Sequence, residues 1–486
     1  MADTSVAPIE PGAGGSGEGG RERHVRLARV LGPLHIWGLG VGIVLVGEYM
    51  GWNFAVEKGG MLGALVAAWV AGILYICVSL MDSEMTSTMA TTGGQYTQAK
   101  HTIGPLMAFN VGLFLVFEYT MLEAADANVI TYLGTLIADE LGYVGSINQY
   151  AFIVLAIVLL SWLNYRGVLL TLSINFVITA IAFAAIVALF IAVQGFNPGG
   201  GDVHAGLAGQ ESNGLPYGWL GAFAALQFGM WYYLGIEGTA QAAEECRSAA
   251  RAIPLGTICG IITLLLAATL TWYVSSALLP WQYLAGSITP LFDAAKTYGG
   301  PLTAVLAAGT VLATLASANG CINDASRAWF AMGRDNYLPA FFGAAHPRYR
   351  TPFRAILTLV PVGIAFAVLP VLLDNPALLA TVITFSILSA LLLYCFVVVN
   401  MFRFRKLWPL GSLDRGYVHP FHPIPAIMLA VLAAAVLIAT FLGFGTTLLT
   451  LIVFYFLASV WFVLFRYRYV RRGAQFTLPW PKPRGY

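Results

Sequence analysis

The sequence predicts an all-α polytopic membrane protein with twelve transmembrane helices. Of its 486 residues, 58% are hydrophobic and only 10% are charged, whereas soluble domains carry about 25% charged residues. Apolar runs of about 20 residues, the length needed to cross a bilayer core, recur along the whole chain. Both observations exclude an ordinary soluble domain.

The apolar runs also locate the expected crossings. They fall near 33–56, 61–82, 104–134, 149–165, 170–195, 217–243, 254–279, 300–332, 353–371, 376–401, 423–442 and 446–467. The third and eighth are the longest, at about 30 residues each, which indicates strongly tilted helices.

The chain ends are predicted to be cytoplasmic. Residues 1–29 form a Gly/Ser-rich flexible tail without the apolar core of a cleavable signal peptide. Residues 30–470 form the transmembrane domain, and 471–486 form a second tail. Arg and Lys gather in the loops that this orientation places inside, and only Lys58 and Lys296 fall outside. The positive-inside rule therefore indicates a multi-pass protein of the cell (inner or plasma) membrane.

Several function classes are disfavoured. The net charge is +2, with no basic stripe, so nucleic acid is not an expected partner. The five cysteines are scattered singly, which argues against a metal site. HExxH and GxSxG motifs are absent from the sequence, so we expect neither an enzyme nor a cofactor.

Two crossings contain a glycine-flanked glutamate. "VLVGEYMGWNF" places Glu48 between Gly47 and Gly51, and "WYYLGIEGTA" places Glu237 just after Gly235. These segments belong to the first and sixth crossings. A pair of interrupted helices five apart is typical of an inverted repeat with a ligand site at the breaks. Glycine can alternatively serve close helix packing.

The repeat pattern divides the membrane domain into three parts. Repeat one covers about 33–195, repeat two about 217–401, and two additional helices lie at about 423–467. The two long crossings, the third and the eighth, are again five apart, as a five-plus-five repeat requires.

Acidic residues inside the membrane are functional candidates, because a carboxylate at mid-bilayer costs several kcal/mol. On the third crossing, Glu118 is predicted near the midplane. Glu123 and Asp126 share a helix face, and either line an outer vestibule or buttress the tenth crossing. So many acids without internal Lys or Arg indicate a cationic ligand, a bound cation or titrating protons.

Other acids are assigned to the cytoplasmic ends of crossings. Asp324 and Arg327 are expected to form an ion pair on a helix surface. The rest are expected to be solvated or paired between helices: Asp82, Glu84, Glu244 and Glu245.

Three stretches resemble a known family. They are "TTGGQYTQAKHTIGP" (91–105), "WYYLGIEGTAQAAEECRSAARAIPLG" (231–256) and "ASRAWFAMGRDNYLPAFFGAAHPRYRTP" (325–352). Over about residues 30–470, the chain resembles the amino acid–polyamine–organocation (APC) superfamily of permeases. The resemblance implies a LeuT-type five-plus-five inverted repeat and secondary transport by alternating access. A channel or a non-transporting sensor is a less favoured alternative.

The first crossing, "LGPLHIWGLGVGIVLVGEYMGWNF", most resembles the ethanolamine permease group, with Met50 at a usually aromatic position. A glutamate at the break would attract an ammonium group and repel a carboxylate. The resemblance thus implies a small amine or amino alcohol as substrate. The alternative is an amino acid permease or exchanger in which Glu48 is structural.

The same resemblance implies which residues bind the substrate. Trp231 would stack over the ligand, and the others would line the two breaks and the third crossing. The set is Gly47, Glu48, Tyr49, Gly51, Glu118, Trp231, Gly235 and Glu237.

The coupling ion, H⁺ or Na⁺, stays open in the sequence. Some proton-coupled relatives place a lysine on the fifth crossing where this chain has Ala182. Ser317 and Asn319 could supply sodium ligands, although such residues also bond the backbone. With Glu123 and Asp126, they form a second tier of candidate pathway residues. The sequence leaves the oligomeric state undetermined.

Overall fold

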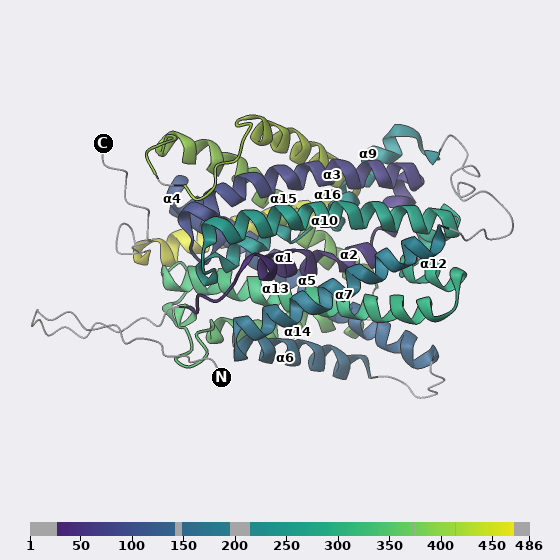
Figure 1. The fold of residues 1–486 in the computed structure, drawn as a ribbon. Coiled ribbons are helices and arrows are strands. Elements are labelled where there is room, and N and C mark those ends of the chain that lie inside the picture. Colours follow the sequence, from purple (N-terminus) through teal and green to yellow (C-terminus); the bar gives the residue numbers. More distant parts are fainter. Residues whose placement is uncertain (1–26, 141–147, 195–213, 374–375, 414, 471–486) are drawn as a thin grey trace, which may run out of the picture.

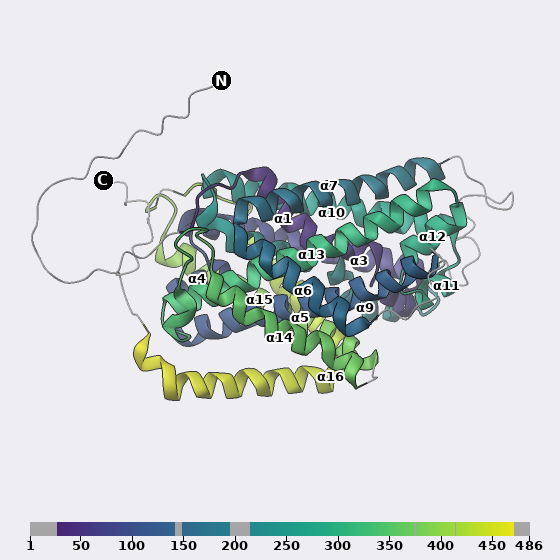
Figure 2. The same cartoon turned by 90° about the horizontal axis from the view of Figure 1, so that it is seen from below.

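The computed structural model describes residues 27–140, 148–194, 214–373, 376–413 and 415–470. Within these ranges the regular structure is helical, apart from one isolated bridge between Leu31 and Cys246. Nine of the described helices are long and apolar enough to cross a membrane. They run side by side along a common axis (Figures 1 and 2). This architecture confirms the predicted all-α class.

The described residues up to 194 contain seven helices. They are α1 (Pro33–Val44), α2 (Val46–Tyr49), α3 (Asn53–Met89), α4 (Gly94–Thr102), α5 (Pro105–Glu140), α6 (Gln149–Arg166) and α7 (Val168–Val193).

The described residues from 214 onward continue the bundle. Their elements are α9 (Gly218–Gly229), η3 (Met230–Tyr232), η4 (Ile236–Glu245), α10 (Ala249–Leu278), α11 (Trp281–Gly286), α12 (Pro290–Tyr298), α13 (Pro301–Arg334), η5 (Ala340–Gly343), α14 (Phe353–Leu372), α15 (Pro376–Leu407), α16 (Ile424–Trp461), η6 (Phe462–Arg466) and η7 (Tyr467–Tyr469). Helices α4 and α12 lie at opposite ends of the bundle in both views (Figures 1 and 2). These ends are called the α4 end and the α12 end below.

The predicted long crossings correspond to α5, with 36 residues, and α13, with 34. Helix α3 is equally long, with 37 residues, because it continues across a kink at Gly60. The eleventh and twelfth crossings are joined in α16, whose helical geometry is interrupted at Phe444. Since helices are broken in two places and joined in another, the count of twelve crossings stays a prediction.

Both glycine-containing segments interrupt their helices, as predicted. After α2, Met50 is extended (φ −155°, ψ 162°) and Gly51 has φ +91°. After η3, Gly235 has φ +105°, and the chain continues as the 3₁₀ helix η4. Residues with side chains rarely adopt these positive φ values, so glycine permits each break. Helix α1 leads to the first break and packs against α7, α10 and α13.

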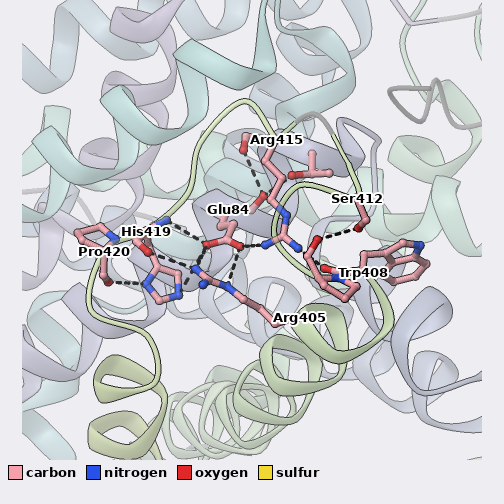
Figure 3. Close-up of polar contacts among 10 residues, drawn as sticks. Glu84, Arg405, Trp408, Ser412, Arg415, His419 and Pro420 are labelled. Carbon is pink, nitrogen blue, oxygen red and sulfur yellow. Dashed lines mark hydrogen bonds and ion pairs between the residues drawn. The ribbon is translucent and has the colours of Figure 1, made fainter. Parts of the chain in front are cut away.

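At the α4 end, Glu84 is buried and bound by two arginines (Figure 3). Arg405 donates to both carboxylate oxygens, at 3.0 Å and 2.6 Å, and Arg415 donates to Oε1. The backbone N–H of His419 also donates to Glu84, at 3.0 Å. Burial lowers the pKa of His419, which favours its neutral form. The sequence left two expectations for Glu84, a solvated carboxylate or one paired between helices. The two arginines confirm the paired one.

The predicted Asp324–Arg327 surface pair is wrong. Both residues are buried, and Arg327 instead donates to both oxygens of Glu245 in η4, at 2.5 Å and 2.9 Å. Its Nη1 also donates to the Asn323 carbonyl of its own helix. Because the guanidinium turns toward η4, this ion pair joins two elements rather than two turns of α13.

A second ion pair joins the same elements. Arg334 of α13 lies 2.9 Å from Glu244 at the end of η4. Burial alone would raise the pKa of Glu244, but Arg334 and the backbone N–H of Thr92 outweigh it and lower that pKa. Glu244 is thus ionised and holds η4 to α13 at the α4 end.

We predict that Glu84→Gln destabilises the folded protein. The substitution leaves Arg405 and Arg415 without their buried carboxylate, and removing one partner of such a pair costs about 3–5 kcal/mol. A lower melting temperature of the purified protein would show it.

Glu57→Gln is the matched control, because Glu57 forms an exposed pair with Lys58 in which both side chains are more than 40% exposed. Exposed pairs contribute little to stability. Equal melting temperatures for the two variants would contradict the structural role of Glu84.

Candidate functional site

The indole of Trp231 packs directly on the first break. Its Nε1 donates to the Met50 carbonyl at 3.1 Å. A Cβ added to Gly47 would lie 2.7 Å from the Trp231 carbonyl oxygen, and one added to Gly51 would meet the indole ring. The two glycines therefore allow the segment around Trp231 to approach the first break closely, so the two predicted breaks face each other.

Glu48 lies within this contact and is fully buried. Among the described residues, neither of its carboxylate oxygens has a hydrogen-bond partner. Its charge acts on the hydroxyl groups of Tyr232 and Tyr233, and the Tyr233 hydroxyl is likewise unbonded within the described structure. An anionic group beside aromatic rings is a suitable environment for an ammonium ion.

Tyr49 reaches α7 and α13. Its hydroxyl donates at 2.6 Å to the carbonyl of Ala182 on α7, the position that lacks the lysine of some relatives. The ring packs against Gly309 of α13. Tyr49 thus anchors the first break to α7 and α13.

Glu118 and Glu237 form a second group. Their buried carboxyl groups interact electrostatically, although both Glu118 oxygens and Oε2 of Glu237 lack an aligned hydrogen bond among the described residues. Glu237 also accepts from the Tyr394 hydroxyl at 2.8 Å, which in turn is hydrogen-bonded to Tyr75 at 2.9 Å. Glu118 and Glu237 therefore belong to one polar cluster that includes two tyrosines.

The predicted residues fall into two groups that meet where the rings of Tyr75 and Tyr233 pack together, with their centroids 5.6 Å apart. Glu48 interacts with the tyrosines next to Trp231, whereas Glu118 interacts with Glu237. A Cβ added to Gly235 would collide with Ile43 of α1. The positive φ of Gly235 and this close approach bring η4 against the first helix.

Sequence reasoning missed Asp324 as a site residue. Its Oδ2 is buried and has no hydrogen-bond partner among the described residues. It lies against Gly238 of η4, next to the Tyr119 hydroxyl. The sequence feature that could have identified Asp324 is its position seven residues after Ser317, which places both residues on one face of α13.

Asp82 was expected to be either solvated or paired between helices, and it is not solvated. It is buried and accepts from Gln98 and, at 2.9 Å, from Gln95. The same Gln95 amide donates to the Glu237 carbonyl at 3.1 Å. Gln95 therefore connects the second break to α3 and α4.

Asn319 takes part in an amide chain. Asn164 donates to its Oδ1 at 2.9 Å, and its Nδ2 donates to Asn175 at 3.1 Å. Asn175 then donates to the Gly38 carbonyl of α1. These bonds favour a packing role for Asn319. In the described part of the chain, three or more His, Cys, Asp or Glu side chains are nowhere grouped to hold a metal ion.

A helical membrane bundle with two facing breaks and unmatched internal acids is the architecture of a solute transporter. Residues 35–475 match the amino acid permease family model. The chain belongs to this family, which confirms the predicted APC superfamily and identifies a multi-pass membrane transporter rather than an enzyme.

The relatives agree on the class. An uncharacterized transporter of Rhizobium meliloti (strain 1021) is 59% identical over the full length of both chains. A branched-chain amino acid permease of Bacillus subtilis (strain 168) is 24% identical over 89% of this chain and 93% of its own length. A methylthioribose transporter of the same organism is 26% identical over 83% and 87%, respectively.

We predict that Gly51→Ala strongly reduces substrate uptake. The added methyl group would displace the Trp231 indole and separate the two breaks. Uptake into proteoliposomes measures the effect, and we expect a loss of about 10-fold or more, which corresponds to about 1.4 kcal/mol or more.

Gly411→Ala is the control for backbone strain. Gly411 has φ +92°, almost the same as Gly51, but nothing lies within 4 Å of the position of its Cβ. If both variants lost uptake equally, strain and not the contact with Trp231 would explain the effect.

Proposed function

We propose that this permease is a secondary transporter of a small amine or amino alcohol, ethanolamine-like, that works by alternating access. The observation that carries the proposal is the state of Glu48. It is fully buried at the first break, with both oxygens unpartnered among the described residues. A buried, unmatched carboxylate is costly, and a cationic ligand would offset that cost.

The surroundings of Glu48 favour an ammonium group over a carboxylate. Tyr232, Tyr233 and the half-buried Trp231 supply aromatic rings next to the carboxylate. Cation–π contacts in a dry site contribute about 2 kcal/mol. A substrate carboxylate at the same place would be repelled by Glu48, so the chemistry around Glu48 favours a cation without an acidic group.

The packing supports rigid-body motion of a bundle made of the first, second, sixth and seventh crossings. Helix α3 packs extensively against α9 and α10, and α1 packs against α10 on one side and against α7 and α13 on the other. Of these, α1, α3, α9 and α10 carry the two breaks. In the proposed cycle they rock against the helices around α5 and α13, with the ion pairs at the α4 end forming and breaking. Both termini would lie on the cytoplasmic side.

An amino acid substrate is the second candidate. The named relatives include a branched-chain amino acid permease and a human cationic amino acid transporter 4, which is 26% identical over 79% of this chain and 61% of its own length. In that case the substrate carboxylate would meet free backbone N–H groups at the breaks, and Glu48 would serve structure.

A ligand panel on the purified protein separates the two candidates. We expect ethanolamine to raise the melting temperature in a saturable manner, because a ligand that binds only the folded state stabilises it. Stabilisation by alanine or leucine without any effect of ethanolamine would contradict the amine proposal.

We predict that Glu48→Gln abolishes ethanolamine uptake while the protein still folds. The amide keeps the size of the side chain but removes the charge that holds the ammonium. A loss of about 100-fold in affinity corresponds to about 2.7 kcal/mol. Radiolabelled uptake and the yield of monodisperse protein report the two effects.

Glu57→Gln again serves as control, since it removes an exposed acid from the start of α3. Glu48→Gln with wild-type uptake and affinity would assign Glu48 to structure alone.

A further inference from the structure

Polar side chains line the contact between α5 and α13, away from Glu48. Residues spaced by three or four positions share one helix face, and each helix contributes three such residues to the contact. We call them the α5–α13 seam: Tyr119, Glu123 and Asp126 on α5, and Ser317, Cys321 and Asp324 on α13.

The seam residues meet in a fixed order, because the two helices run antiparallel. The Ser317 hydroxyl reaches Asp126 nearest the α12 end. Cys321 comes next and lies among Glu123, Asp126 and Asp324. Asp324 and Tyr119 then meet at Gly238 of η4. The seam thus extends from Asp126 to the Glu118–Glu237 pair.

The seam side chains are buried, and several of their polar atoms lack hydrogen-bond partners in the described part of the chain. All six side chains are at most 2% exposed. Within the described structure, both oxygens of Glu123, Oδ2 of Asp126 and the Ser317 hydroxyl make no aligned hydrogen bond. The Glu123 carboxyl instead lies against Gly363 of α14, with Oε1 only 3.0 Å from where a Cβ would stand. Among the described residues, Glu123 is therefore an acid without a donor, and Asp126 has the Ser317 hydroxyl nearby but no donor to its Oδ2.

No basic side chain of the described ranges compensates Glu123 and Asp126. The charged group that acts on Glu123 is Asp126, while α13 presents Ser317 and Cys321 to Asp126. Only Asp324 is near a cation, Arg327, whose guanidinium is bound to Glu245. The buried carboxyl groups of Glu123 and Asp126 therefore need neutralisation from outside the chain.

A proton meets this need better than a metal ion. Na⁺ would require a shell of several oxygen ligands, whereas the side chains here are packed around one another. A proton needs no such shell. Hydroxyl groups such as those of Ser317 and Tyr119 can accept one hydrogen bond while donating another, so they can relay a proton between carboxyl groups.

We propose that the α5–α13 seam binds the coupling protons and conducts them between the α12 end and the Glu118–Glu237 pair. Each step transfers one proton from a carboxyl group to the next carboxylate, and water at the α12 end supplies the proton. The inference rests on the proposed function as a secondary transporter, and it assigns the seam to protons and Glu48 to the substrate.

Asp126→Asn tests the proposal in proteoliposomes of the full-length protein. The substitution keeps the size of Asp126 but removes its ability to release a proton. We expect accumulation of ethanolamine driven by an imposed pH gradient to fall at least 10-fold. Ethanolamine counterflow, which needs no net proton movement, should stay within twofold of wild type.

Thr131→Val is the matched control on α5. Thr131 is buried just beyond the seam, and its hydroxyl bonds the Ala127 carbonyl of its own helix at 3.0 Å. This variant should keep both activities. Ser317→Ala provides a second seam variant with no change in charge, and it should slow pH-driven accumulation about threefold.

The outcomes that overturn the proposal are distinct from those that overturn the proposed function. Full pH-driven accumulation by Asp126→Asn, or wild-type accumulation driven by a Na⁺ gradient alone, would refute the proton seam. Absence of ethanolamine counterflow in the wild type would refute only the amine assignment.

Infrared difference spectra between acidic and alkaline buffer then test the seam without any substrate. A protonated-carboxyl band that disappears in Asp126→Asn supports the proposal, and an unchanged spectrum overturns it.

Discussion

The hydrogen bond from Trp231 to the Met50 carbonyl is the interaction on which the centre of this permease depends. Met50 is extended, so its carbonyl lies outside any helix. Inside a membrane, an unsatisfied backbone group costs several kcal/mol, and broken helices persist only where another group satisfies the exposed backbone. The indole supplies that bond, and Gly47 and Gly51 leave the space for it. The first break, the two glycines and Trp231 therefore form one structural unit.

The buried acids also differ in whether another group of the protein satisfies them. At the α4 end, Glu84 and Glu245 are fully buried, and arginines bind both oxygens of each carboxylate. Nearer the centre, Glu48 and Glu123 are equally buried but have no donor among the described residues. Buried charges that are paired stabilise one arrangement of the helices. An unpaired buried carboxylate is costly, and binding a mobile cation offsets that cost. The difference separates acids that close one end of the bundle from acids that handle ligands.

Local signals in the sequence were sufficient for the helices and for both breaks, because hydropathy and glycine act over a few residues. Pairings through space were not predictable in this way. The spacing of Asp324 and Arg327 suggested an ion pair within one helix, yet Arg327 reaches Glu245 in η4, far away in the sequence. Likewise, Glu48 and Glu118 both looked like ligand residues, but helix packing sends Glu48 to Tyr232 and Tyr233 and Glu118 to Glu237. Such partners depend on the rotation of each helix about its axis, which a single sequence does not specify.

The short helix η4 and the residues just before it connect the two polar groups physically. Tyr232 and Tyr233 face Glu48, Gly235 packs on α1, and Gly238 gives Asp324 and Tyr119 room to approach. A cation at Glu48 and a proton on the α5–α13 seam would therefore both act on the same broken segment. Coupling between two ligands requires one element whose equilibrium both of them bias. The 3₁₀ geometry of η4 leaves this segment less regularly hydrogen-bonded than an α-helix, so it is the element whose rearrangement can link substrate release to proton transfer.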